Sequence, residues 1–282
     1  MKSHIKRSWV WNFLVAIPKQ IIMLFFGLIA IYPIYYLVIT TFKTRQDWIH
    51  NQFGLPSVFT LQNLTDALNK GNLPLWFMNS LVVTVASLIV STIVSALAAY
   101  AVARFRFTGR KFYYNSMVVL MVIPPAVLIL PLFVLMVNIG LINKLPSVII
   151  FYSGLMIPFS IYLLVSFFRN IPTELFDAAA IDGCSNLDIF WRITLPLTTP
   201  AIVTLVVVNT LFVWNELFIA LVFLQGENVM TLMAGLTLFK GHFTVNEPLI
   251  MAGTLIATLP MILLYFFGQQ LFVEGLTAGA IK

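Results

Sequence analysis

Six long stretches of the sequence carry almost no charge, and they constrain the fold more than any other feature. A helix that crosses a bilayer needs about 20 largely apolar residues in a row. The stretches are apolar on every side and longer than barrel strands, which alternate over about 10 residues. We therefore expect an all-α polytopic membrane bundle of six transmembrane helices in a single domain over residues 1–282. Their centres lie near residues 21–39, 79–102, 114–137, 146–168, 200–224 (interrupted by Glu216) and 249–272.

The composition agrees with a membrane location and excludes several classes of protein. Only 9% of the 282 residues are charged, whereas a typical soluble domain has about 25%. Such a chain cannot cover itself with a surface compatible with water, which excludes a soluble enzyme, a disordered tail and a nucleic-acid-binding domain. The one cysteine, Cys184, allows no intrachain disulfide and no cysteine-based metal site.

The basic residues predict the orientation of the chain. With both termini in the cytoplasm, eleven of the 16 Lys and Arg residues fall in inner segments, and the segment 104–111 alone has four. The positive-inside rule then places residues 1–20 and 273–282 in the cytoplasm. The basic start before an apolar run could suggest a cleavable signal. The run is too long for one and no cleavage site follows it, so we expect a retained first helix.

One long loop, residues 169–199, differs from everything around it because it holds four of the ten acidic residues. Local signals divide the loop into two short helices. Thr173 is the expected N-cap of the first, and Gly183 is the expected left-handed residue after its end. Ser185 and Asp188 have capping-box spacing at the start of the second, which Pro196 is expected to end. Thr199–Pro200 then begins the fifth span.

The two short helices would share an apolar face. Many cytoplasmic loops only connect spans, but connections in helical bundles are usually short. An insertion of two amphipathic helices needs something to bury its apolar side, which favours a docking partner over a simple connector. The residues expected on this face are Phe176, Ile181, Leu187, Ile189 and Phe190.

The pattern Asp-Ala-Ala-x-x-Asp-Gly in this loop, followed by Phe190 and Leu-Pro, resembles the EAA loop of ABC importer permeases. In that family the loop forms coupling helices that fit a cleft on the ATP-hydrolysing subunit. Asp177 stands where Glu is usual, so the carboxylate is kept on a side chain one methylene shorter. The residues that the resemblance implies in coupling to the ATPase are Glu174, Asp177, Ala178, Ala179, Asp182, Gly183, Phe190, Leu195 and Pro196.

Two further matches resemble the carbohydrate-type permeases, close to the maltose-transporter class. Residues 269–282 resemble the tail of that class, which reaches toward the ATPase dimer and implies contacts from Gly275, Gly279 and Lys282. The motif Trp-Asn-Glu ending at Glu216 is the other match. Together these resemblances cover about residues 75–282, and the first 74 residues match only in general shape.

The resemblance implies a multi-pass permease of a bacterial or archaeal cytoplasmic membrane that moves a sugar or oligosaccharide by alternating access. Its partners would be a second, different permease subunit, an ATPase dimer and an extracytoplasmic solute-binding protein touching the loop 225–247. ATP and magnesium would bind the ATPase, because this sequence has no phosphate-binding G-x-x-x-x-G-K-[ST] loop. The chain itself would be no enzyme and would hold no cofactor or metal.

Three polar residues inside predicted spans are candidates for the translocation path. Glu216 is the one acid well inside a span, where a charge costs about 2.5–3.5 kcal/mol. Asn209 lies two turns earlier on the same helical face. Asn79 opens the second span, where N-capping is the favoured role. For Glu216, a structural role near the outer interface, paired to the partner permease, stays equally open.

Other interpretations remain open at this stage. An ABC permease for another solute, such as an amino acid, is the nearest, and the C-terminal match argues against it. An ion-coupled secondary transporter predicts paired intramembrane charges or internal repeats, and neither is found. A membrane-embedded enzyme needs a cluster of reactive groups at depth, where only Glu216 is available. Prolines 124, 125 and 131 are expected to break the third span.

Overall fold

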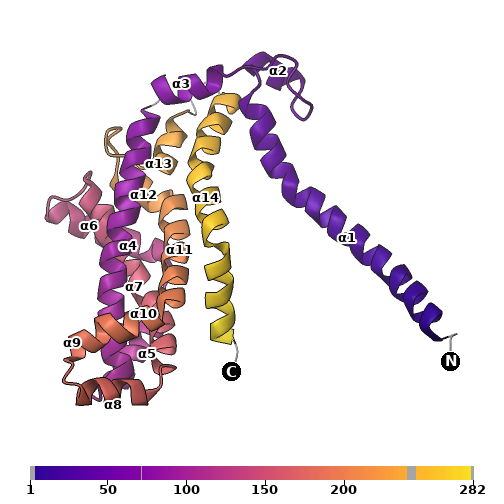
Figure 1. Ribbon diagram of the computed structural model, residues 1–282. Helices are drawn as coiled ribbons and strands as arrows, with labels where there is room; N and C mark the ends of the chain where they lie inside the picture. Colours follow the sequence, from indigo (N-terminus) through magenta and orange to yellow (C-terminus); the bar gives the residue numbers. More distant parts are fainter. Residues whose placement is uncertain (1–3, 71, 240–245, 281–282) are drawn as a thin grey trace. The chain divides into compact units, whose positions relative to one another are not determined.

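The computed structural model describes residues 4–70, 72–239 and 246–280, and side chains within 18–69, 72–239 and 246–269. All regular elements in these ranges are helices (Figure 1). The chain divides into two compact units, Met1–Gly71 with Phe239–Ile256, and Asn72–Leu238 with Ala257–Lys282. The expected single domain therefore stays a prediction, and each unit is described by itself.

The first unit contains α1 (His4–Thr41), α2 (Arg45–His50), α3 (Gln62–Lys70) and the beginning of α14 (Glu247–Ala280). The buried ammonium of Lys43 organises the loop after α1, where its Nζ donates to the carbonyls of Asn51 at 2.6 Å and Gln52 at 3.1 Å. Burial lowers the pKa of Lys43, while the nearby carboxylate of Asp47 opposes that shift. The Asn63 amide donates to the Thr41 and Lys43 carbonyls, both at 2.7 Å, and so ties α3 to the end of α1.

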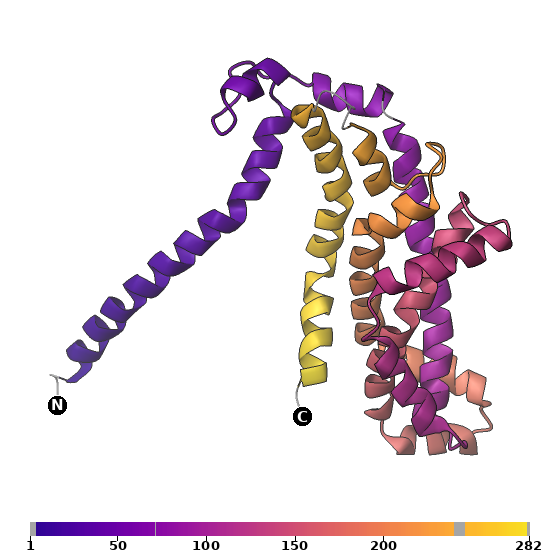
Figure 2. The same ribbon diagram turned by 180° about the vertical axis from the view of Figure 1, so that it is seen from behind.

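The second unit is built around three helices that run side by side (Figures 1 and 2). They are α4 (Leu73–Arg104), α7 (Leu145–Arg169) and α11 (Thr199–Asn215), and the α4–α7 pair packs most extensively. Buried small residues on α4, including Ser87, Ser91, Ser95 and Ala99, let the helices approach closely, as in many membrane bundles. The remaining elements are α5 (Arg110–Leu120), α6 (Pro125–Asn138), α8 (Thr173–Ile181), α9 (Asn186–Ile189), a π-helical turn (Phe190–Thr194), α10 (Leu195–Leu197), α12 (Phe218–Phe223), α13 (Leu232–Leu236), a 3₁₀ turn (Thr237–Phe239) and the rest of α14.

The predicted spans correspond to helices, with two interruptions. By length and composition, four helical segments of the described residues can each cross a membrane: Pro18–Thr41, Leu73–Arg104, Leu145–Arg169 and Glu247–Gln269. Two further pairs of helices are long and apolar enough only when both members are taken as one bent span. They are α5 with α6, bent by 101°, and Asn186–Leu197 with α11, bent by 75°, and they raise the number of candidate spans to as many as six. The expected all-α membrane fold is confirmed.

Only some of the prolines in the third span interrupt its helix. Pro124 and Pro125 coincide with the break between α5 and α6, as expected. The expected break at Pro131 is wrong, because this residue lies inside α6, which continues to Asn138. A proline in a membrane helix is tolerated where the surroundings satisfy the carbonyl that it leaves free.

Candidate functional site

The helix α8 ends in the left-handed turn expected from its glycine. Gly183 has φ +80°, the Cys184 N–H donates to the Ala179 carbonyl at 3.0 Å, and the Gly183 N–H donates to the Ala180 carbonyl at 3.1 Å. This pair of bonds is a Schellman motif, which satisfies carbonyls left open at a helix end. The predicted N-cap is wrong by one residue. Pro172 has extended backbone and occupies the cap position, so Thr173 already begins the helix.

The second short helix begins as predicted and ends later. The Ser185 hydroxyl accepts from the Asp188 N–H at 3.2 Å, and the Asp188 carboxylate accepts from the Ser185 N–H at 3.1 Å, which completes a capping box. Pro196 does not end the helical segment. A π-helical turn precedes it, in which the Leu195 N–H donates to the Phe190 carbonyl, and the chain stays helical to Leu197. Thr198 rather than Thr199 then caps α11.

The predicted apolar face of the loop divides into a buried and an exposed part. Phe176, Ile189 and Phe190 are buried against the rest of the chain, whereas Ile181 is 87% exposed and Leu187 is 62% exposed. The expectation that the whole face waits for a partner is therefore wrong. The ends of the neighbouring spans already cover its aromatic half.

Residues at the end of α4 hold the two coupling helices. The Arg104 guanidinium lies 3.2 Å from the centre of the Phe176 ring. The Tyr100 ring lies 5.2 Å from the Phe190 ring, and its hydroxyl donates to the Asn186 carbonyl at 3.2 Å. Both helices are thus fixed to one membrane helix through cation–π, aromatic and hydrogen-bond contacts.

Five exposed residues of the loop form what we call, after its predicted role, the coupling surface: Glu174, Asp177, Ile181, Asp182 and Leu187. The surface thus combines three exposed carboxylates with two exposed aliphatic side chains. The other predicted coupling residues have different environments. Ala178, Gly183 and Pro196 are also exposed, Leu195 is partly buried, and Ala179 and Phe190 are buried.

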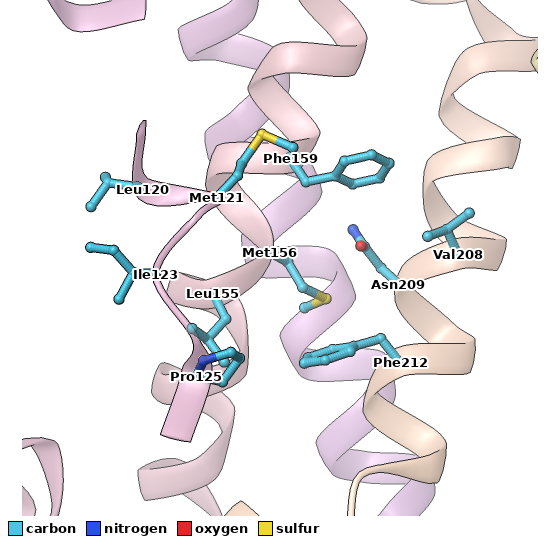
Figure 3. A pocket seen from close by; sticks show the side chains of 10 residues that line it. All are labelled: Leu120, Met121, Ile123, Pro125, Leu155, Met156, Phe159, Val208, Asn209 and Phe212. Atoms are coloured by element: carbon cyan, nitrogen blue, oxygen red, sulfur yellow. The ribbon is translucent and has the colours of Figure 1, made fainter. Parts of the chain in front are cut away.

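A cavity of about 290 Å³ lies between α7, α11 and the break in the third span (Figure 3). Asn209 projects toward it from α11, is 3% exposed and donates from Nδ2 to the Ser160 hydroxyl at 3.2 Å. Its other lining residues are apolar: Leu120, Met121, Ile123, Pro125, Leu155, Met156, Phe159, Val208 and Phe212. One amide among apolar and aromatic side chains fits the usual composition of small-ligand sites, which are mostly apolar with a few polar groups.

Glu216 lies at the break between α11 and α12 and is not among the residues that line this cavity. Its carboxylate accepts from the Tyr152 hydroxyl at 2.6 Å. It also accepts from the backbone N–H groups of Ile219, at 2.9 Å and 3.0 Å, and Ala220, at 3.2 Å. The negative charge is therefore compensated by the start of α12 and by one tyrosine of this chain.

Asn79 holds a loop to α4. The favoured capping role is wrong, because α4 begins at Leu73 and Asn79 lies inside it. The Asn79 Nδ2 donates to the carbonyls of Asn228, at 3.0 Å, and Met230, at 2.9 Å. The Trp76 indole adds a bond to the Glu227 carbonyl at 2.8 Å, so the segment after α12 is fastened to α4.

The C-terminal tail is only partly visible. Helix α14 continues through Gly275 and Gly279 to Ala280. The side-chain surroundings of these positions, and Lys282 itself, lie outside the described residues. The predicted contacts of the tail with an ATPase stay a prediction.

Several of these residues were not found from the sequence. No motif in the sequence assigns a functional role to Tyr100, Arg104, Tyr152 or Ser160. The Tyr152 and Ser160 contacts join positions 64 and 49 residues apart, which no local pattern reports. The one signal available was that each places a polar group inside or at the end of an apolar run.

The structure therefore shows a bundle of apolar helices with an exposed two-helix loop at one end, an architecture that a transport permease would have. Residues 91–276 match the family model described as binding-protein-dependent transport system inner membrane component, and the chain belongs to this family. It is accordingly the permease component of an ABC importer, a multi-pass inner membrane protein that is not itself catalytic.

Full-length relatives agree with this assignment. The chain is 35% identical to the probable ABC transporter permease protein YurM of Bacillus subtilis (strain 168), over 100% of this chain and 90% of the relative. It is 32% identical to the melibiose/raffinose/stachyose import permease protein MelC of the same organism, over 89% of this chain and 91% of the relative. The fold matches a chain of a bacterial ABC transporter involved in the import of the acidic polysaccharide alginate, with a TM-score of 0.81, 23% identity, and coverage of 96% and 98%. Membership of the family implies a transporter complex with a binding protein and an ATPase.

Proposed function

We propose that this chain is one of two different permease subunits of an importer that moves a sugar or oligosaccharide by alternating access. The observation that carries the proposal is a loop that presents the exposed coupling surface and is attached to α4 through its buried residues. The substrate class is supported by relatives at about 30% identity whose names refer to melibiose, raffinose and stachyose, or to arabinooligosaccharides. No feature of the cavity selects one of these sugars.

The chemistry of the coupling surface describes the ATPase site that it would fit. The ATPase cleft would need basic groups at its rim to pair with Glu174, Asp177 and Asp182. It would need an apolar floor to bury Ile181 and Leu187. Burial of two exposed aliphatic side chains supplies binding free energy, while the acids set orientation and partner choice. The tail residues Gly275, Gly279 and Lys282 would add a second contact with the ATPase dimer.

Movement would pass from the coupling surface to the spans through the buried half of the same loop. Phe176 and Phe190 are held by Arg104 and Tyr100 of α4, so a displacement of α8 and α9 displaces the end of α4 with them. Closure of the ATPase dimer upon ATP binding would thus rock the permease and open it outward. This chain would transmit the movement, and ATP hydrolysis would take place on the ATPase subunits.

Asn209 marks the section of the translocation path that this chain would line. Phe159 and Phe212 offer rings for the apolar faces of a sugar, and Asn209 offers an amide for a hydroxyl. We assign Glu216 and Asn79 to the support of this path, because neither lines the cavity and their polar groups bind elements of the chain itself. Both termini and the coupling surface would face the cytoplasm, and the segment 225–247 would face the binding protein.

Co-purification with the ATPase tests the coupling role. Ile181→Asp places a charge on the coupling surface, and we expect the ATPase to be lost and uptake to stop. Leu55→Asp is the matched control, because Leu55 is an exposed leucine, 69% accessible, in the first unit. Normal ATPase association and uptake in Ile181→Asp would refute the coupling role.

Reconstitution of the purified complex in proteoliposomes tests the substrate class. We expect a binding protein loaded with an oligosaccharide to stimulate ATP hydrolysis and uptake. Stimulation only by an amino-acid-loaded binding protein would identify an ABC importer for another solute. Uptake that needs an ion gradient and no ATP would identify a secondary transporter.

A further inference from the structure

The short connection between α4 and α5 forms an open pocket that none of the proposed transport roles uses. The pocket has a volume of about 360 Å³ and lies directly after the end of a membrane-spanning helix. Arg104 at that end contacts α8, so the pocket lies at the same end of the second unit as the coupling helices (Figure 1). The residues that line it are Arg106, Phe107, Gly109, Arg110, Lys111 and Phe112.

The pocket is strongly cationic. Three of its lining side chains are Arg or Lys, and no acidic residue occurs anywhere in the sequence from Ala67 to Thr173. Arg106 and Lys111 are exposed, and neither forms a salt bridge within the described part of the chain. The Arg110 guanidinium donates to the Ala103 carbonyl at 3.4 Å, which holds that charge beside the end of α4. Uncompensated cations around one hollow favour an anionic ligand.

The backbone adds to this preference. The pocket lies at the N-terminus of α5, an 11-residue helix that begins after Gly109 with φ +88°. Glycine has no side chain to cap the first amide groups, and no side-chain cap is seen there among the described residues. The positive end of the helix dipole therefore adds to the three cationic side chains at the same place.

Two of the lining residues are phenylalanines, which distinguishes the ligand of this pocket from a free anion. Phe112 is 79% exposed and Phe107 is 45% exposed. Exposed apolar residues continue along and beyond α5, with Val119 at 64% and Val122 at 79%. Aromatic rings beside basic groups at the end of a membrane span are typical of the headgroup region of a bilayer.

We propose that this pocket binds the headgroup of an anionic phospholipid. Arg106, Arg110 and Lys111 contact the phosphate, and Phe107 and Phe112 lie against the upper part of the acyl chains. Basic pockets between membrane helices bind lipid phosphates in this manner. A zwitterionic lipid offers the same phosphate with a compensating positive charge, so phosphatidylglycerol is preferred over phosphatidylcholine.

Native mass spectrometry of the full chain, purified with the subunits that accompany it, measures the binding. Phosphatidylglycerol and phosphatidylcholine are titrated separately, and inorganic phosphate is added as a competitor. We expect selective retention of phosphatidylglycerol. In Arg106→Gln/Lys111→Gln we expect its affinity to fall about 30-fold, since each basic residue near an anionic membrane contributes about fivefold. Arg45→Gln/Lys144→Gln removes the same charge from other exposed positions and leaves the affinity unchanged.

The aromatic half of the pocket has its own test. Phe112→Ser keeps every cation, and we expect weaker retention of phosphatidylglycerol while the response to inorganic phosphate is unaltered. Equal binding of the two lipids, or equal losses in the two double variants, would overturn the proposal. Full displacement by millimolar inorganic phosphate would identify a phosphate site instead. Loss of the ATPase with lipid binding intact would identify a protein interface.

Discussion

The Arg104 guanidinium lies 3.2 Å from the centre of the Phe176 ring and joins the last residue of α4 to the first coupling helix. A cation over an aromatic ring contributes about 0.5–2 kcal/mol, and more as water is excluded. Phe176 is 5% exposed, so this contact lies at the sheltered end of that range. It gives the coupling surface a rigid attachment to a span that crosses the bilayer.

Arg104→Gln tests this attachment. We expect the ATPase to stay bound, because the coupling surface is unchanged, while uptake per ATP hydrolysed falls several-fold. The measurement is transport and ATP hydrolysis in the same proteoliposomes. Arg45→Gln, an exposed arginine of α2, is the control and should leave the ratio unchanged. An unaltered ratio in Arg104→Gln would show that movement passes elsewhere.

Gly183→Val tests the turn between the coupling helices. A Cβ at this position meets no atom within 4 Å, so the cost is not steric crowding. It comes from φ +80°, a left-handed conformation that costs L-residues about 1–2 kcal/mol and β-branched residues more. We expect uptake to be uncoupled from ATP hydrolysis. Gly183→Asn should retain coupling, since Asn tolerates this conformation, and equal behaviour of the two variants would contradict the explanation.

Glu216→Gln tests the support of α12. The carboxylate accepts from one hydroxyl and two backbone N–H groups, and the amide offers only one acceptor oxygen. We expect the free energy of unfolding to fall by about 1–3 kcal/mol, the usual cost of leaving a buried hydrogen-bonding group unsatisfied. Tyr152→Phe removes one hydrogen bond and should destabilise the protein less than Glu216→Gln. The double variant should destabilise it by less than the sum of the two single variants. Full stability with lost transport would instead return Glu216 to the translocation path.

Asn209→Leu tests the cavity. The replacement removes its amide and keeps a similar volume, so we expect a raised KM for uptake with normal ATPase association. Thr204→Val is the control on the same helix, because Thr204 is buried and its hydroxyl donates within α11, to the Pro200 carbonyl at 2.9 Å. Equal effects on KM in both variants would point to a general change in α11 rather than to substrate contact.

Ser185→Ala tests the capping box by titration. Hydrogen bonds from the Ser185 hydroxyl and N–H hold the pKa of Asp188 below its ordinary value. A carboxyl with a lowered pKa in the folded state stabilises the fold above its unfolded pKa, about 3.9, and loses that contribution as the pH falls through the folded pKa. The helix α9 should therefore loosen only in acid. Carbon-13 titration of Asp188 should show its pKa rising in Ser185→Ala, and an unchanged pKa would rule out the hydroxyl as its cause.

Much of the fold was predictable because apolar runs report directly on the bilayer. The positions of α1, α4, α7 and α14 follow from charge-free segments, and the Gly183 turn and Ser185 cap follow from local hydrogen bonding. The predictions were wrong at positions where contacts with other helices determine the local structure. Pro131 lies inside a helix, Asn79 binds a loop rather than a helix start, and Phe176 is covered by its own chain.

The sequence alone determined which segments are apolar enough to cross a membrane and which loop carries the Asp-Ala-Ala-x-x-Asp-Gly pattern, since both depend on residues close together in the chain. Only the tertiary structure decided what each polar or aromatic side chain contacts. Glu216 meets Tyr152, Arg104 meets Phe176, and the cations from Arg106 to Lys111 surround one pocket. These relationships depend on which helices pack together. In a bilayer that packing is set by close fit and polar contacts between distant segments, which hydropathy does not record.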